Sequence, residues 1–187
     1  VQKGKGYPKG LRMPQLTLPV LAALTPPDVE VLVTEEEIEE LTYKGDVDLV
    51  GISFMTPTAP RAFEIADEYR KRGVKVVLGG MHASALPGEA INHADAVVIG
   101  EAENVWQQVI DDFKTDELKK FYRSDTMADL SGMPIPRRDL QKKMMTVSPF
   151  SIQTTRGCPF ACDFCIVTSF FGNTFRFRPP GDVIKEI

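Results

Sequence analysis

Residues 48–80 decide the fold, and they read DLVGISFMTPTAPRAFEIADEYRKRGVKVVLGG. Residues 48–53 contain a continuous apolar run, LVGI at 49–52, as expected for a strand that is covered on both faces. In residues 59–71 apolar side chains recur at helical spacing, which is typical of a helix with one buried face. Residues 74–78 (VKVVL) are a second, mostly apolar run, and the pair Gly79-Gly80 ends it. The stretch therefore predicts two parallel strands joined by a helix.

The same alternation continues on both sides of this unit. We expect further strands at residues 29–33, 96–99 and 118–122, and further helices at 13–24, 34–41, 86–93 and 105–113. Strands that alternate with helices in this way indicate parallel β-α-β units. The predicted fold is therefore α/β, with a doubly wound parallel sheet of the Rossmann or flavodoxin-like kind. Ligands of such sheets bind beyond the carboxyl ends of the strands, and the segments at those ends are small and polar here (residues 53–56, 79–84 and 100–103).

Composition and charge divide the chain into two modules. Of the 187 residues, 43% are hydrophobic and 26% charged, as in a globular chain, and no run is apolar enough to cross a membrane. The net charge is −4, whereas a general nucleic-acid binder is usually basic, so no nucleic-acid partner is expected. We expect one domain over residues 1–125, a linker over 126–149, and a second module over 150–187 that contains a strand (150–155) and a helix from Asp182.

All three cysteines lie within eight residues, in the sequence RGCPFACDFC of residues 156–165. A disulfide framework would distribute an even number of cysteines along the chain, so this cluster points to a metal or redox site in a cytoplasmic protein. Three thiolates from one loop can bind one face of a [4Fe–4S] cluster and leave its fourth iron open. A zinc site with a distant fourth ligand, and a closed electron-transfer cluster, are the alternatives.

This loop resembles the signature of the radical S-adenosylmethionine (SAM) superfamily. The resemblance implies that Cys158, Cys162 and Cys165 hold a [4Fe–4S] cluster. The open iron would bind SAM, and an electron from the cluster would cleave it to a 5′-deoxyadenosyl radical. Phe164 would lie near the adenine of SAM. Residues 150–187 would then be the first βα unit of a truncated (β/α) barrel, and the chain would be an N-terminal fragment that is inactive alone.

The first module resembles the cobalamin-binding-like domain that often precedes such a barrel, with its first strand absent. The matching residues are Ser53 in GISFMT, Gly79 and Gly80 in VVLGGMH, and the stretch GEAE at 100–103. The resemblance implies that Ser53 contacts the nucleotide tail of cobalamin and that the two glycines let the backbone approach it. His82 follows the glycines and is a candidate for the same pocket. The chain has no Asp-x-His-x-x-Gly loop, the cobalt-ligating motif of base-off cobalamin domains, so protein ligation of cobalt is not expected.

Several charged residues near these motifs admit a simpler interpretation. Arg156, Arg176 and Arg178 could contact the SAM carboxylate or an anionic substrate, but we expect them to be solvated surface charges. Glu101 and Glu103 are expected to cap or flank the helix that follows them, where acidic side chains suit the helix dipole. No catalytic residue is assigned from the sequence.

Together the two resemblances predict a radical SAM enzyme. The expected reaction is cobalamin-associated C-methylation, or a rearrangement, of a lipid or other secondary metabolite. The expected partners are that small-molecule or lipid substrate and an electron donor of the flavodoxin or ferredoxin type. A relative of the tRNA methylthiotransferases and a non-catalytic corrinoid- or zinc-binding module are the alternatives.

Overall fold

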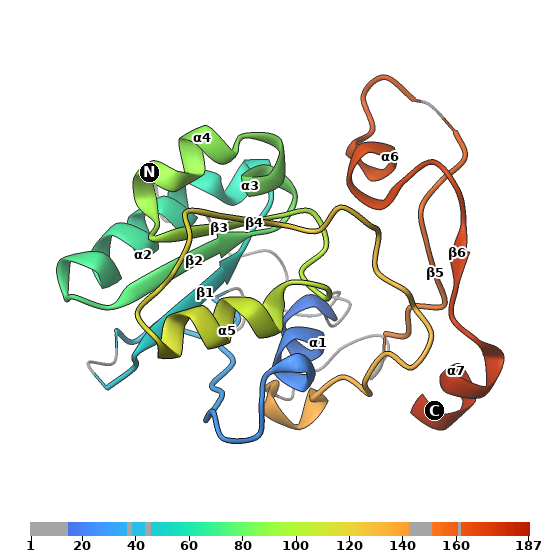
Figure 1. Cartoon of the computed structure of the whole chain (residues 1–187), viewed down its shortest axis with the longest axis horizontal. Coiled ribbons are helices and arrows are strands. Elements are labelled where there is room, and N and C mark those ends of the chain that lie inside the picture. Colours follow the sequence, from blue (N-terminus) through green and yellow to red (C-terminus); the bar gives the residue numbers. More distant parts are fainter. Residues whose placement is uncertain (1–14, 37–38, 44–45, 143–150, 161) are drawn as a thin grey trace.

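A parallel four-stranded sheet lies at the centre of the protein (Figure 1). The computed structural model describes residues 15–36, 39–43, 46–142, 151–160 and 162–187. The strands are β1 (Leu49–Ser53), β2 (Lys75–Gly79), β3 (Ala96–Ile99) and β4 (Phe121–Arg123). They are hydrogen-bonded in the order β1-β2-β3-β4, and each neighbouring pair is parallel.

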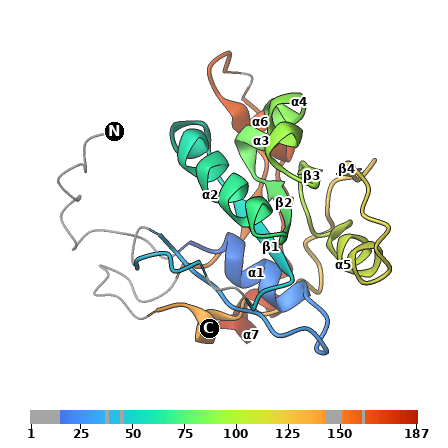
Figure 2. The ribbon, with the colours of Figure 1, turned by 90° about the vertical axis from the view of Figure 1, so that its left-hand side faces the viewer.

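Helices cover both faces of this sheet, which confirms the predicted α/β fold. On one face lie α2 (Ala59–Lys71), α3 (Met81–Ala85) and α4 (Pro87–Ala90), which continues into a short 3-10 turn, Ile91–His93. On the other face lie α5 (Trp106–Lys114) and α1 (Thr17–Leu24), which contact each other (Figure 1). In Figure 2, α2 and α5 lie on opposite sides of the strands.

The alternation of side chains along β2 creates two hydrophobic cores. Val76 and Leu78 are fully buried and pack in the core beneath α2, whereas Val77 points to the opposite face and packs with Val109 of α5. Burial of one such aliphatic side chain stabilises a fold by about 1.5–3 kcal/mol. The continuous apolar runs of the sequence therefore supply both faces of the sheet.

The carboxyl ends of three strands are joined to one another. Gly80, just beyond β2, has φ +94°, and a Cβ at this position would lie 2.6 Å from the backbone oxygen of Phe54, just beyond β1. Ser84 of α3 donates to the Gly80 carbonyl (2.8 Å) and accepts a hydrogen bond from the amide of Gly100, just beyond β3 (2.9 Å). These contacts combine the segments after β1, β2 and β3 into one edge of the domain.

The chain between the two modules packs against the first one. Ala128 and Leu130 are buried, and the amide of Arg137 donates to the Pro19 carbonyl of α1 (3.0 Å). A 3-10 turn, Arg138–Leu140, follows. The segment that we predicted as a linker is thus bound to the surface of the sheet domain over its described residues.

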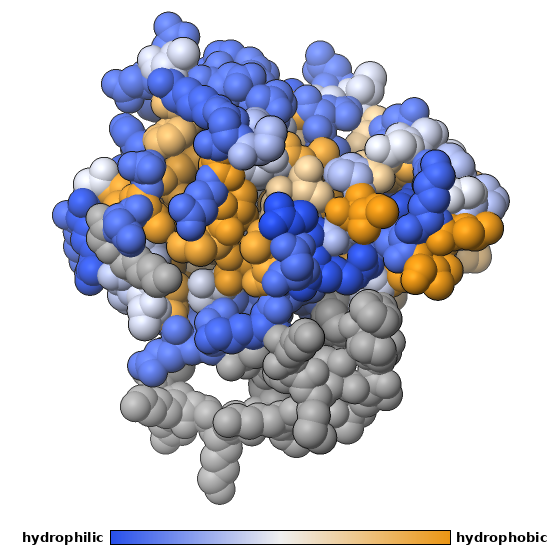
Figure 3. All heavy atoms as spheres, turned by 90° about the horizontal axis from the view of Figure 1, so that it is seen from below, coloured by the Kyte–Doolittle hydropathy of each residue, from blue (hydrophilic) through white to orange (hydrophobic). Residues whose placement is uncertain are grey.

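The cysteine-containing module consists of short elements. Strand β5 (Thr155–Arg156) pairs antiparallel with β6 (Arg176–Phe177), and the helices are α6 (Ile166–Phe171) and α7 (Pro180–Glu186). Helix α6 contacts α3 of the first module. Large apolar side chains of this module are exposed, among them Phe177, Ile184 and Ile187. Figure 3, seen from below, shows an apolar patch at the end of the molecule where this module lies.

Two predicted elements of the first module are wrong. Residues 29–33 do not form a strand, because nothing in the described chain pairs with them, and Leu32 is largely exposed. The described part of 34–41 contains no helix. Its acidic side chains instead pair with other segments, since Glu36 binds Arg61 and Glu39 binds Lys142.

In the second module, the predicted strand 150–155 is reduced to β5, and residue 150 lies outside the described residues. Strand β6 and helices α3 and α6 were not predicted. These elements are short, and their sequences lack the long periodic pattern that identifies a strand or helix.

Candidate cofactor edge and cysteine loop

Ser53, Gly79 and Gly80 form one patch at the carboxyl edge of the sheet, which we call the cofactor edge. Ser53 and Gly79 are direct partners in the β1–β2 register, and Gly80 follows immediately. Ser53 is exposed, and a Cβ on Gly79 would meet only ordinary contacts, with Val98 at 3.8 Å. The patch therefore offers a hydroxyl and accessible backbone without bulky side chains, which suits close approach of a ligand.

Gly80 also has a role within the chain itself. Its positive φ and the 2.6 Å approach to Phe54 mean that a side chain at this position would collide with the backbone after β1. The resemblance to cobalamin-binding-like domains implies that Gly80 lets the backbone approach the cofactor. The structure adds that Gly80 is required for the strand ends to meet.

His82 lies beside this edge but is buried. Its Nδ1 is 3.2 Å from the hydroxyl oxygen of Thr56, and its Nε2 is 3.2 Å from a carboxylate oxygen of Glu89. The ring also packs near the aromatic rings of Phe54 and Phe63. Because both ring nitrogens have partners within the chain, His82 would have to give up one of them to contact a cofactor.

The three cysteines lie in the loop between β5 and α6. All three are free thiols; Cys162 is exposed, and Cys158 and Cys165 are partly buried. The amide of Cys158 donates to the Gly172 carbonyl (3.2 Å), which joins the start of the loop to the end of helix α6. Within the described residues no three His, Cys, Asp or Glu side chains are grouped closely enough to hold a metal ion. The chemistry of three accessible thiols nevertheless fits the soft ligands that iron–sulfur clusters require.

Phe164, which precedes the last cysteine, has a 93% exposed side chain. It therefore contributes little to the packing of the loop and is free to contact a ligand.

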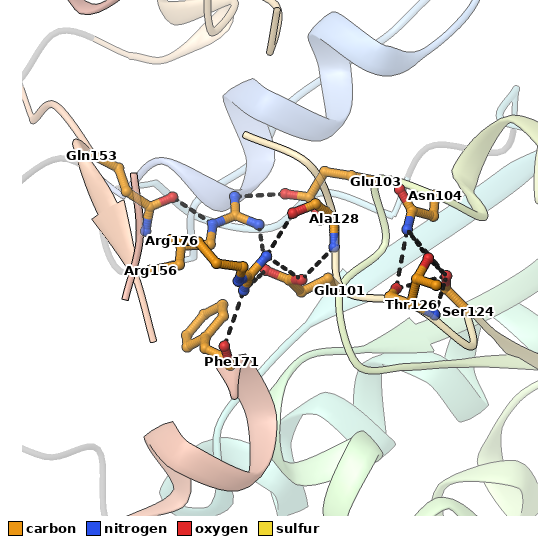
Figure 4. A network of polar contacts seen from close by, with 10 residues as sticks. All are labelled: Glu101, Glu103, Asn104, Ser124, Thr126, Ala128, Gln153, Arg156, Phe171 and Arg176. Atoms are coloured by element: carbon orange, nitrogen blue, oxygen red, sulfur yellow. Dashed lines mark hydrogen bonds and ion pairs between the residues drawn. The ribbon is translucent and has the colours of Figure 1, made fainter. Parts of the chain in front are cut away.

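A buried ion-pair network connects the end of β3 with the cysteine loop (Figure 4). Glu101 accepts hydrogen bonds from Arg156 (2.8 Å), from both terminal nitrogens of Arg176 (2.8 and 2.9 Å) and from the Ala128 amide (2.9 Å). Arg156 also pairs with Glu103 at 2.6 Å. The side chains of Glu101 and Arg156 are only 4% and 8% exposed. All four charged groups therefore lie in contact and away from solvent.

The network overturns two expectations. Arg156 and Arg176 are not solvated surface charges, because both bind Glu101 in a largely buried position. Glu101 and Glu103 do not cap the following helix, since α5 begins only at Trp106 and its N-cap makes no side-chain hydrogen bond. The charges pair because burial of an isolated ion is costly, whereas a partner of opposite charge offsets that cost.

Burial and charge act in opposite directions on the pKa of Glu101. Removal from water by itself raises the pKa of this carboxyl, but hydrogen bonds from Arg176 and Arg156 and the Ala128 amide outweigh that effect, so the pKa is lowered overall. Burial likewise lowers the pKa of Arg156, and its bonds to Glu103 and Glu101 more than reverse this, so its pKa is raised. Both groups are therefore charged at neutral pH.

Arg178 belongs to a second buried ion pair. Its guanidinium binds Glu186 of α7, and Glu186 also binds Arg138 from the segment before the cysteine module. The expectation that Arg178 is a solvated surface charge is therefore wrong as well. Burial raises the pKa of Glu186, but the hydrogen bonds from Arg138 and Arg178 outweigh it and lower the pKa overall.

Sequence reasoning missed both networks. For the Glu101 network the available signal was the charge distribution, since residues 137–187 carry eight basic and four acidic side chains while the rest of the chain is acidic. That asymmetry indicates attraction between the modules, but it does not identify which residues pair.

Helices of membrane-spanning length and hydrophobicity are absent from the part of the chain that the structure describes.

Comparison with known proteins supports the interpretation of the first module as a cobalamin-binding domain. Residues 5–110 match the B12 binding domain family. The chain is 41% identical over 172 residues to the bacteriochlorophyllide d C-8(2)-methyltransferase of Chlorobaculum tepidum, with 88% of this chain and 38% of the relative covered. It is 30% identical over 144 residues to the C-12(1)-methyltransferase of the same organism, with 75% and 32% covered.

A more distant relative is the hopanoid C-2 methylase of Rhodopseudomonas palustris, which is 27% identical over 181 residues, with 94% of this chain and 34% of the relative covered. This chain thus spans only about a third of the length of these relatives. The family match, in contrast, includes more than half of this chain and the whole of β1, β2 and β3. The chain therefore belongs to the B12-binding domain family.

Proposed function

We propose that this chain is the cofactor-binding front part of a cobalamin-dependent radical SAM methyltransferase, which adds a methyl group to carbon of a small molecule or lipid. One observation carries the proposal: helix α6, which directly follows Cys165, contacts helix α3, which directly follows Gly80. The cysteine loop and the cofactor edge are thereby joined through neighbouring helices. The names of the relatives, which are methyltransferases and a methylase, support the same reaction class.

In this proposal Cys158, Cys162 and Cys165 hold a [4Fe–4S] cluster. When bound together with SAM, such a cluster supplies the electron that generates a 5′-deoxyadenosyl radical from SAM. The chain's own contribution is a set of three thiols on a loop whose start is joined to the end of α6 by the hydrogen bond from the Cys158 amide to the Gly172 carbonyl. Phe164 adds an exposed aromatic ring beside the last ligand, where it can stack on the adenine of SAM.

The cofactor edge binds cobalamin, which supplies the methyl group when bound. Ser53 provides a hydroxyl for hydrogen bonding, and Gly79 leaves its backbone accessible beside it. His82 would supply no ligand to cobalt, because the ring is buried and its two nitrogens contact Thr56 and Glu89. Ser53 and Gly79 would instead hold the nucleotide side of cobalamin.

Anaerobic reconstitution of the full-length protein tests this function. We expect iron and sulfide incorporation that is lost when the three cysteines are replaced by Ala, and an EPR signal of the reduced cluster that changes when SAM is added. Cobalamin should remain bound through gel filtration, and the variant Ser53→Ala should retain less of it. Stoichiometric zinc without iron, or a cluster signal that is insensitive to SAM, would contradict the proposal.

A further inference from the structure

Glu101 is bound by the two strands that flank the cysteine loop and helix α6, and by the backbone of Ala128. Its two oxygens accept four hydrogen bonds, from Arg156 at the start of the loop, from Arg176 on the strand after it, and from the backbone of Ala128. The bond to Arg176 is bidentate, which fixes orientation as well as distance. One carboxylate at the end of β3 thus connects three separate parts of the chain.

Arg156 transmits this attachment to the first cysteine. It ends β5, and only Gly157 separates it from Cys158. Gly157 has φ +89°, and a Cβ there would lie 2.0 Å from the Thr174 carbonyl oxygen, so the chain has little freedom between the arginine and the cysteine. The guanidinium of Arg156 also binds Glu103 and lies over the Phe171 ring, 5.7 Å from its centre.

Arg176 transmits the attachment to the other end of the loop. It pairs with Arg156 in the β5–β6 register, and it donates to the carbonyl of Phe171 (3.0 Å), the last residue of α6. Helix α6 begins immediately after Cys165. The strand before the first cysteine and the helix after the last one are therefore both fixed to Glu101.

We infer that Glu101 and Glu103 are positioning residues that hold the cysteine loop against the B12-binding domain. The inference rests on the proposed function for its consequence, since the attachment sets the placement of the cluster loop relative to the cofactor edge. Two carboxylates face two guanidinium groups, so the network is neutral as a whole while its members are largely buried. Loss of Glu101 removes the carboxylate partner of Arg176 and one of the two partners of Arg156, which favours release of the loop.

Limited digestion with trypsin tests the attachment without any cofactor. Trypsin cleaves after arginine and lysine. Arg156 and Arg176 are held by this network, whereas Lys119 lies in an exposed loop and serves as an internal reference. In Glu101→Gln we expect cleavage after Arg156 and Arg176 to be at least ~10-fold faster than in the wild type, because local opening exposes these bonds. Cleavage after Lys119 should be unchanged.

The matched control is Glu68→Gln, which removes a carboxylate from an exposed ion pair with Arg72 on α2. If Glu101→Gln and Glu68→Gln give the same cleavage pattern as the wild type, the inference is wrong. Glu103→Gln provides a second variant, because it weakens only the Arg156 side of the network. If cleavage in both network variants is accelerated relative to the wild type by the same factor at every site, including Lys119, the two glutamates maintain the whole fold. The inference is then also wrong.

The reconstituted full-length protein then gives the functional consequence. We expect Glu101→Gln to retain cobalamin like the wild type, but to show an altered cluster EPR signal and about 10- to 100-fold lower methyl transfer, as is typical when residues that orient metal ligands are lost. Equal loss of both cofactors would indicate a general structural role and contradict the inference. If the wild type binds no iron, the proposed function fails, whereas the digestion result still decides whether the network holds the loop.

Discussion

The two modules of this chain are stabilised by different forces. The sheet domain contains fully buried aliphatic side chains such as Val76, Leu78 and Val97, which pack between helices and strands. In the described part of the cysteine module, helices α6 and α7 contain no buried apolar residue, and the module is attached by the ion pairs of Arg156 with Glu101 and of Glu186 with Arg138. The sheet domain is therefore specified by its own core, whereas the position of the cysteine module depends on ion pairs with its neighbours.

This difference predicts that removal of an apolar side chain has unequal effects in the two modules. Leu78→Ala removes a fully buried side chain and should lower the free energy of unfolding by about 2–5 kcal/mol. Ile184→Ala, on helix α7, removes a side chain that is 70% exposed and should change it by less than about 0.5 kcal/mol. Urea denaturation followed by circular dichroism measures both values. Similar losses in the two variants would contradict the comparison.

Substitution of one glycine in each module compares how the two modules respond to a change in the backbone. Gly157→Ala places a Cβ 2.0 Å from the Thr174 carbonyl oxygen, and relief of this overlap should cost about 1–3 kcal/mol within the cysteine module. Gly73→Ala, in the sheet domain, also adds a side chain at positive φ, but nothing lies within 4 Å of it, so only about 1–2 kcal/mol of conformational strain is expected.

The two glycine variants should also differ in where the damage appears. Hydrogen exchange measured by mass spectrometry should show faster exchange in residues 155–177 for Gly157→Ala, with β2 and β3 unchanged. Faster exchange throughout the sheet in that variant would show that the cysteine module supports the sheet domain, contrary to the comparison.

Acid should release the cysteine module before it unfolds the sheet domain. The pKa values of Glu101 and Glu186 are lowered in the folded chain from a reference value of 4.5, because their arginine partners outweigh the effect of burial. A carboxyl with a lowered pKa stabilises the fold fully above its unfolded pKa, and this stabilisation is lost as the pH falls through the folded value. Attachment should therefore be constant from pH 7 to about pH 5 and weaken below about pH 4.5.

Amide hydrogen exchange measures this effect. The rates in residues 155–187 and in β2 are compared at pH 7, 5, 4 and 3, after correction for the intrinsic exchange rate at each pH. Glu186→Gln should expose the same residues at neutral pH and reduce the pH dependence. Simultaneous opening of both regions in the wild type would argue against separate stabilisation.

The same difference explains what could be predicted from the sequence. Helix α2 and strands β1 to β3 follow from local periodicity, because apolar runs and helical spacing reflect burial directly. The spacing of the three cysteines likewise identified a metal-binding loop as a hypothesis before any coordinates. The B12-binding domain was recognised from short stretches around Ser53 and Gly79-Gly80, and the family match confirms it.

The attachment of the modules could not be predicted in this way. Glu101 binds Arg156 and Arg176 across 55 and 75 residues of sequence, and no local pattern encodes a contact over such a separation. Residues 29–33 show the opposite failure, since their β-branched pattern favours a strand but no neighbouring strand pairs with them in the described chain.

Substitution of Phe164 should have a very small effect on stability. Its effect on function should be the most specific of those predicted here. Its side chain is 93% exposed, so Phe164→Ala should change the free energy of unfolding by less than about 0.5 kcal/mol. Under the proposed function the ring stacks on the adenine of SAM, and loss of about 1–1.5 kcal/mol of stacking corresponds to roughly tenfold weaker SAM binding. Phe160→Ala, in the same loop and 70% exposed, is the control and should bind SAM like the wild type. Equal SAM affinity in the wild type, Phe164→Ala and Phe160→Ala would show that Phe164 does not contact SAM.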